Sequence, residues 1–202
     1  MRDLEIRGAG NLLGPEQSGY MMSVGYDMYL QLLEEAVLEE RGEKKARRAD
    51  TTADLTVSAN LPESYIPSPE QRVDVYRRIA ALQTQDESRD LLDELLDRYG
   101  EPPKSVLALM DVALLRTAAA EVGVRDITQR GETVTFTFGG EGFPVEAVMR
   151  LCSSPKNRRV LTLSAGTEPR LALRLAPGED VLERALALVN ELNFKKEAEP
   201  LF

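Results

Sequence analysis

The sequence predicts an α+β fold in which a helical cluster packs with a small mixed or antiparallel sheet, preceded by a glycine-rich segment and a helix. Two patterns lead to this prediction. Residues 69–122 carry apolar side chains at helical spacing in three successive segments, whereas residues 133–175 contain short runs that alternate apolar and polar side chains. With 202 residues and a hydrophobic content of 43%, the chain has enough material for one medium domain with an appendage.

The appendage is predicted at the N-terminal side. Residues 1–25 are aperiodic and contain five glycines. A helix is expected next, because apolar side chains recur at helical spacing on one face: Tyr29, Leu32, Leu33, Ala36 and Val37. Residues 43–48 (EKKARR) read as a charged linker. We therefore divide the chain into residues 1–49 and a domain of residues 50–202.

The middle of the chain is predicted to be mainly helical. Residues 53–59 alternate like a strand, with Leu55 and Val57 on one face. A helix then begins after Ser68, a suitable N-cap followed by proline at the first helical position. A second helix presents a stripe of leucines and ends at Gly100, because Pro102 and Pro103 forbid its continuation. A third runs from about Pro103 to Gly123. The apolar stripe of the second helix comprises Leu91, Leu92, Leu95, Leu96 and Tyr99.

The last third of the chain combines strands and helices. Residues 133–138 (TVTFTF) alternate strictly and predict a half-buried strand. A short helix is expected after Pro144, with Val145, Val148 and Met149 on its apolar face. Residues 159–164 and 170–175 predict a hairpin around a turn that contains Gly166. A final helix is expected over about 181–192.

The composition excludes most catalytic machinery. The chain has no histidine, which removes Ser-His-Asp and Cys-His nucleophile systems and histidine metal sites. The single Cys152 forms no intrachain disulfide, and we expect it to be a buried apolar residue rather than a nucleophile. No run of about 18 apolar residues and no signal peptide is apparent, so we expect a cytoplasmic protein without a membrane span.

The sequence also lacks the known nucleotide-binding motifs. The glycines at Gly8, Gly10 and Gly14 lack the spacing and the preceding strand of a dinucleotide fingerprint. No GxxxxGK[ST] phosphate loop occurs, and the Asp93-Glu94-Leu95 run lies inside a predicted helix rather than at the end of a strand. The residues therefore provide no catalytic site, no metal site and no cofactor site.

One acidic surface stands out instead. The net charge is −9, and residues 51–123 account for most of it, with 7 basic and 13 acidic side chains. Four carboxylates of the second predicted helix recur at i, i+3, i+4 and i+7 and share one face: Asp90, Asp93, Glu94 and Asp97. Their mutual repulsion costs a few tenths of a kcal/mol per pair, at about the size known for like charges on a helix. The face is interpreted either as a docking surface for a basic partner or as an ordinary solvated face.

Three sequence runs resemble a known family. Residues 2–19 (RDLEIRGAGNLLGPEQSG) resemble the segment that follows the second motor lobe in two kinds of bacterial DNA translocase, the RecG branch-migration helicases and the transcription-repair coupling factors. Residues 61–67 (LPESYIP) and 94–103 (ELLDRYGEPP) are similar to the C-terminal domain of the coupling factors alone. The resemblance extends over essentially the whole chain, and its last third matches in pattern more than in identities.

The resemblance implies that this chain is a C-terminal fragment of a coupling factor. In that family the full protein is an ATP-dependent translocase on duplex DNA that removes stalled RNA polymerase and recruits nucleotide-excision repair. ATP and magnesium would then bind only in a motor upstream of residue 1. Arg7 and Gln17, in a glycine-containing context with Gly8 and Gly10, match the residues that couple ATP hydrolysis to movement.

The resemblance also implies an autoinhibitory role for the C-terminal domain. In the family this domain packs on an N-terminal module similar to UvrB and masks the surface that binds UvrA. Glu94 and Asp97 match the acidic residues of that contact. We therefore expect a non-catalytic regulatory domain whose partner is the N-terminal module, with UvrA and RNA polymerase as indirect partners.

Two rival functions remain at this point. The chain could be the DNA-binding accessory domain of a RecG-like helicase, for which the support is four arginines near two predicted strands: Arg158, Arg159, Arg170 and Arg174. It could also hydrolyse nucleotide itself, which the missing phosphate loop argues against. If the chain is instead the regulatory domain of a coupling factor, we expect duplex DNA to be contacted only through the motor of the full-length protein.

Overall fold

The computed structural model describes residues 51–139 and 143–193 and confirms the predicted α+β fold. Its helices are α2 (Pro69–Ala80), α3 (Gln85–Tyr99), α4 (Lys104–Glu121), α5 (Val145–Ser153) and α6 (Val181–Asn193). Its strands are β1 (Thr52–Asp54), β2 (Val124–Arg130), β3 (Thr133–Phe138), β4 (Leu161–Ser164) and β5 (Arg170–Arg174). The glycine-rich segment, the helix predicted around Tyr29 and the motor-coupling residues Arg7, Gly8, Gly10 and Gln17 lie outside the described residues.

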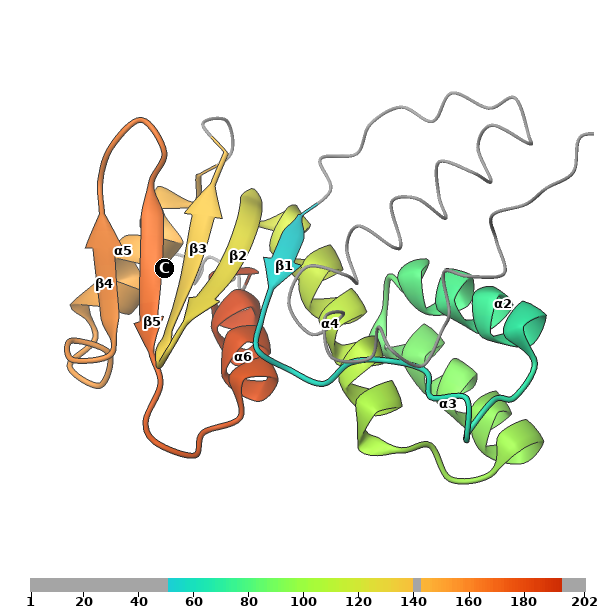
Figure 1. The fold of residues 1–202 in the computed structure, drawn as a ribbon. Helices are drawn as coiled ribbons and strands as arrows, with labels where there is room; N and C mark the ends of the chain where they lie inside the picture. Colours follow the sequence, from blue (N-terminus) through green and yellow to red (C-terminus); the bar gives the residue numbers. More distant parts are fainter. Residues whose placement is uncertain (1–50, 140–142, 194–202) are drawn as a thin grey trace, which may run out of the picture.

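The five strands form one mixed sheet in the order β1-β2-β3-β5-β4. Only β1 pairs in parallel, with β2, and the other neighbours are antiparallel. The β4–β5 pair confirms the predicted hairpin. In Figure 1 the sheet forms one half of the molecule, with β4 at its outer edge and α5 and α6 behind it. No helix of the described part covers the front face of the sheet in this view.

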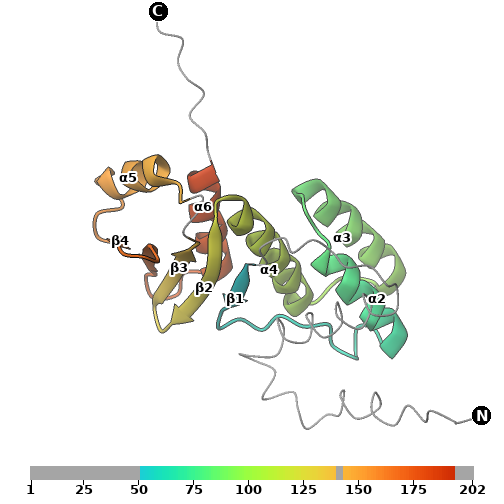
Figure 2. The ribbon, with the colours of Figure 1, turned by 90° about the horizontal axis from the view of Figure 1, so that it is seen from above.

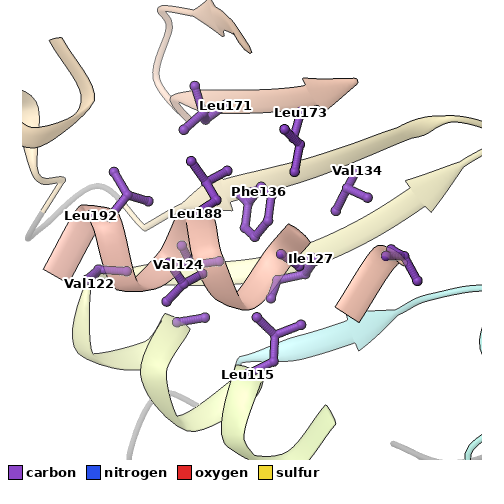
Figure 3. Close-up of a cluster of buried hydrophobic side chains, with 14 of the residues drawn as sticks. Leu115, Val122, Val124, Ile127, Val134, Phe136, Leu171, Leu173, Leu188 and Leu192 are labelled. Atoms are coloured by element: carbon purple, nitrogen blue, oxygen red, sulfur yellow. The ribbon is translucent and has the colours of Figure 1, made fainter. Parts of the chain in front are cut away.

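The back face of the sheet forms the larger hydrophobic core. The alternation predicted for residues 133–138 places Val134, Phe136 and Phe138 on this face, each with no exposed surface. Phe136 lies opposite Ile127 of β2 and Leu171 of β5, so three adjacent strands contribute to one layer. Figure 3 shows this layer meeting Leu188 and Leu192 of α6. The sheet and α6 therefore close on each other through apolar side chains.

A second, smaller core holds the helices α2 and α3 against α4. Its buried residues include Ile79 of α2, Leu95 of α3 and Leu109 of α4. The helix α4 also contributes Leu115 to the core behind the sheet. Eight residues of α4 are buried, and in Figure 2 this helix lies between the α2–α3 pair and the sheet. A helix that packs apolar side chains against two different cores, as α4 does, lies in the interior of the protein.

Local signals in the sequence set the helix ends as predicted. Ser68 is the N-cap of α2, and its hydroxyl accepts a hydrogen bond from the Gln71 N–H at 3.3 Å. Gly100 ends α3 with a φ of 81°, a conformation that strongly favours glycine. The backbone N–H of Gly100 donates to Leu96 O. Asp180, just before α6, accepts hydrogen bonds from the N–H groups of Leu182 and Glu183.

Two strands differ from the prediction. The strand predicted over 53–59 is only Thr52–Asp54, because beyond Asp54 the backbone turns, with Val57 N donating to Leu55 O, and leaves the ladder. Leu55 remains buried without strand pairing. The strand β2 was not predicted at all. An irregularity between Val124 and Asp126 inserts Arg125 into the ladder, which hides the alternation.

Several predicted core positions are more exposed than expected. Leu96, assigned to the apolar stripe of α3, is 51% exposed. Val145 and Met149 of α5 are also exposed, whereas Val148 between them is fully buried. Cys152 is only partly buried. Burial still raises the pKa of its thiol, and a thiol with a raised pKa is a poor nucleophile.

Candidate protein-interaction surface

The helix α3 is held firmly at both ends and along one side. The hydroxyl of its N-cap, Thr84, accepts from Glu87 N–H at 3.2 Å, and the Glu87 carboxylate accepts in return from Gln83 N–H at 2.7 Å. Leu91 and Leu95 are buried on the side that faces the core. Because this side is fixed by packing, the opposite side of the helix presents its polar groups to solvent in a defined arrangement.

The predicted carboxylates emerge on that solvent side. Asp90, Asp93 and Asp97 are exposed, and Glu94 is partly exposed. Within the described residues, the three aspartates make no ion pair. We call these three residues the acidic face of α3. Like charges at this spacing repel one another, so the face would be relieved by a cationic surface placed against it.

Glu94 differs from its three neighbours because it is already neutralised. Arg78 of α2 binds its carboxylate in bidentate fashion: Nη1 donates to Oε1 at 2.6 Å, and Nη2 donates to Oε2. Arg98, one turn further along α3, donates to Oε1 at 3.0 Å. The hydrogen bond from Arg78, followed by that from Arg98, lowers the pKa of Glu94 to about 2. Helical spacing predicts four repelling carboxylates, whereas the structure leaves three unpaired among the described residues.

The pairing comes from Arg78, which lies on a different helix from the predicted acidic face. Arg78 follows Val75 by three residues and precedes the buried Ile79, so it lies on the flank of α2. Glu94 lowers the free energy of the charged guanidinium and raises the pKa of Arg78. Hydrophobic spacing identifies this flank, but only the packing of α2 beside α3 shows which acidic residue it meets.

Two tyrosines fasten the C-terminal end of α3. The Tyr65 hydroxyl donates a hydrogen bond that is shared between two carbonyl oxygens, Leu95 O at 3.2 Å and Gly100 O at 3.0 Å. Its ring meets that of Tyr99 edge to face, with centroids 5.9 Å apart. The Arg98 guanidinium lies 5.1 Å from the Tyr99 ring centroid. This contact holds Arg98 close to Glu94 while the acidic face stays open.

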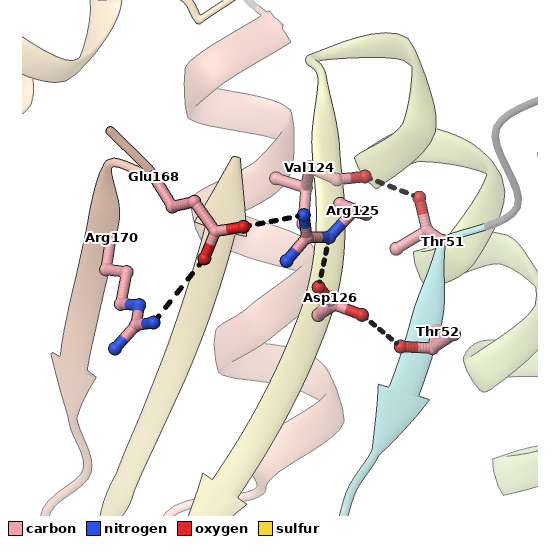
Figure 4. Close-up of polar contacts among 7 residues, drawn as sticks. All are labelled: Thr51, Thr52, Val124, Arg125, Asp126, Glu168 and Arg170. Carbon is pink, nitrogen blue, oxygen red and sulfur yellow. Dashed lines mark hydrogen bonds and ion pairs between the residues drawn. The ribbon is translucent and has the colours of Figure 1, made fainter. Parts of the chain in front are cut away.

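The open face of the sheet carries a different polar cluster. Arg125 bonds to Asp126 at 2.6 Å and to Glu168 at 2.9 Å, and Glu168 also meets Arg170 at 3.6 Å. Thr52 extends the row by donating to Asp126 at 2.8 Å. Figure 4 shows this row crossing from β1 to the start of β5. Arg125 lowers the pKa of Glu168 and its own pKa is raised, as expected for mutual neutralisation.

Three further arginines of the last third of the chain make no ion pair among the described residues. Arg158, Arg159 and Arg174 are exposed, and within residues 51–139 and 143–193 they form no ion pair. Of the four arginines that could support nucleic-acid binding, Arg170 alone is thus partly neutralised. These unpaired cations are the feature of the described structure that supports an anionic ligand near the sheet.

The described residues offer no cluster for a metal ion and no helix that could cross a membrane. They contain no group of three or more His, Cys, Asp or Glu side chains that could hold a metal ion. A recess of about 210 Å³ lies between α6 and the β4 side of the sheet. Two residues of its lining, Lys156 and Glu191, form an ion pair with each other at 3.6 Å. No helix in this part of the chain is long and apolar enough to cross a membrane.

Comparison with known proteins defines the class first. Residues 55–145 match the family model of the TRCF domain. A solved structure described as the C-terminal domain of transcription-repair coupling factor superposes with a TM-score of 0.62. The match covers 71% of this chain and 92% of that one at 21% identity, which shows the shared fold. Residues 55–145 therefore match a TRCF domain in sequence, and the described structure shares the fold of that solved domain.

Curated relatives then give the family of the whole chain. The transcription-repair-coupling factor of Bacillus subtilis is 42% identical over 142 residues, which is 70% of this chain. Those of Staphylococcus epidermidis and Staphylococcus aureus are 40% and 39% identical over 136 residues. The chain belongs to the transcription-repair coupling factor family. It spans 12% of the length of these relatives.

Proposed function

We propose that this chain is the C-terminal regulatory part of an ATP-dependent DNA translocase that removes stalled RNA polymerase and recruits nucleotide-excision repair. In this proposal the chain is not itself catalytic, and ATP and magnesium bind in another part of the longer protein. It acts in the cytoplasm by docking on an N-terminal UvrB-like module of the same protein. Docking hides the surface that UvrA binds, so the chain keeps the repair function switched off until it is released.

The observation that supports this proposal is the acidic face of α3. Asp90, Asp93 and Asp97 are exposed and unpaired in the described part of the chain, on a helix whose caps and core contacts fix its orientation. A preformed, like-charged face loses little conformational entropy on docking and gains from each cation brought to it. Because the relatives show that the chain belongs to this family, we take the partner to be another module of the same protein.

Binding between the 202-residue chain and the separately purified N-terminal module tests the proposal. The double variant Asp93→Asn with Asp97→Asn is expected to weaken binding about threefold to tenfold at low salt, the size expected for two partly exposed charge pairs. The effect should shrink as the salt concentration rises, because exposed pairs are screened.

A matched control separates the acidic face from general charge. Glu146→Gln with Glu183→Gln removes the same charge from α5 and α6, where both residues are exposed. This control should bind like the unmodified chain. Equal affinities for the two double variants would contradict the docking surface that we assign to α3.

A second candidate function is DNA binding by the chain itself, supported by the exposed Arg158, Arg159 and Arg174. The three lie in the last third of the chain, which carries no net charge over residues 124–202. A gel-shift titration with duplex DNA at physiological salt tests this alternative. A shift abolished by replacing the three arginines with glutamine would favour DNA binding; we expect little binding.

A further inference from the structure

The ion pair between Arg78 and Glu94 bears directly on how the acidic face of α3 would bind. Among the contacts of the described residues, Glu94 is the one acidic side chain near this face that is held by a residue from another helix. Its carboxylate accepts three hydrogen bonds, two from Arg78 and one from Arg98. A carboxylate offers about four acceptor positions, so little capacity remains for a further cation.

The pair is nevertheless accessible. The side chains of Arg78 and Glu94 are each 37% exposed, so a partner can approach them without unfolding the domain. Arg78 also occupies the position that an incoming guanidinium would need, because it binds both carboxylate oxygens in the bidentate geometry that arginine prefers. Any arginine of a partner must compete with it.

We infer that Arg78 is an intramolecular competitor, which holds Glu94 against α2 and thereby weakens the attraction of α3 for a basic protein surface. This inference rests on the proposed docking of α3 and adds a restraint on it. With Arg78 in place, the partner meets three unpaired carboxylates. When Arg78 is displaced, Arg98 still binds Oε1 of Glu94, but Oε2 is left free for a cation of the partner beside Asp90, Asp93 and Asp97.

Replacing Arg78 is expected to lower stability and to tighten binding at the same time. Arg78→Gln removes a bidentate ion pair between two helices, so the variant should be slightly less stable than the unmodified chain. It should also bind the N-terminal module more tightly, by about threefold to tenfold at low salt, because Glu94 becomes available to the cations of the partner. A merely structural role for Arg78 would weaken binding together with stability.

The neighbouring residue provides a control of equal charge. Arg77 is exposed on the same turn of α2 and makes no ion pair among the described residues. Arg77→Gln changes the net charge of the chain by the same unit without touching Glu94. The excess tightening of Arg78→Gln over Arg77→Gln measures the release of Glu94 alone.

A double-mutant cycle with Glu94→Gln completes the experiment, with binding measured by calorimetry and folding by thermal denaturation of every variant. In the Glu94→Gln background, Arg78→Gln and Arg77→Gln should have equal effects, since no carboxylate is left to release. Equal effects in the unmodified background, an excess that persists without Glu94, or weaker binding by Arg78→Gln would overturn the inference. Unchanged binding by the Asp93 and Asp97 variants would instead contradict the proposed docking of α3, and absence of binding by every variant would overturn both.

Discussion

The helix α3 and the open face of the sheet are both rich in charge, but they balance it in opposite ways. On the sheet, Arg125, Glu168 and Arg170 alternate in sign and bind one another, and Asp126 and Thr52 continue the row. On the solvent side of α3, Asp90, Asp93 and Asp97 lie together without an ion pair in the described residues, and their neighbour Glu94 is paired.

The difference indicates where a protein partner gains most. A face whose charges already satisfy one another loses interactions when it is desolvated, whereas an unpaired face of one sign gains them. The two faces also rest on different cores, joined by α4. Substitutions in each core and on each charged face would show whether the two parts are one folding unit and whether their charges differ as described.

The largest effect is expected from Phe136→Ala in the core behind the sheet. Phe136 is fully buried between Ile127 and Leu171, and replacing such a side chain with alanine costs about 3–5 kcal/mol. Because α4 belongs to both cores, helix and sheet signals in circular dichroism should be lost in one transition. Leu95→Ala in the smaller core should shift the same single transition. Two separate transitions would show that the regions fold independently.

The next effect concerns a buried arginine of the helical region. Arg72 is 8% exposed and donates to Ile66 O at 2.7 Å and Pro67 O at 2.9 Å. Arg72→Met keeps the apolar stem but leaves these carbonyls without their donor, so the free energy of unfolding should fall by about 1–3 kcal/mol. Arg77→Met, at an exposed position on the same helix, should change it little. Urea denaturation of both variants provides the comparison.

A smaller effect should appear in the pH dependence of stability. The pKa of Glu94 is lowered from 4.5 to about 2, so the folded state holds this carboxylate charged where the unfolded chain protonates it. Its contribution is therefore present above pH 4.5 and is lost as the pH falls toward 2. Glu94→Gln should be less stable than the unmodified chain at pH 7, and the difference should vanish near pH 2. A difference that is independent of pH would contradict the ion pair.

The smallest effect is expected at Tyr99. Its hydroxyl is buried and has no hydrogen-bond partner in the described structure, so Tyr99→Phe should leave the stability unchanged or raise it by up to about 1 kcal/mol. Tyr65→Phe should act in the opposite direction, because its hydroxyl bonds to the carbonyls at the end of α3. Thermal denaturation of the two variants in parallel tests this opposition.

Most helices were predictable because their signals are local. Ser68 with Pro69 marks the start of α2, and Gly100 marks the end of α3, through backbone geometry that needs no tertiary contact. The strand β2 was missed because Arg125 interrupts its alternation, so the buried residues Val124 and Ile127 lie three apart rather than two. The regular pairing of β2 with β3 becomes apparent only in the folded structure.

The candidate surface was predictable in part for the same reason. Helical spacing places Asp90, Asp93, Glu94 and Asp97 on one side of α3, and the structure leaves three of them exposed. The ion pair of Glu94 with Arg78 joins residues that are 16 positions apart on two helices, and it depends on how those helices pack. Whether the surface binds a partner remains a prediction.

The position of α4 has a consequence for how this protein can change in evolution. Leu109 and Leu115, less than two turns apart on this helix, contribute to different cores. A mutation in α4 that alters its length or tilt must suit the α2–α3 pair and the sheet simultaneously. Compensating substitutions are therefore expected in distant parts of the chain at once, and lineages should diverge more readily in α5 or on the open sheet face than along α4.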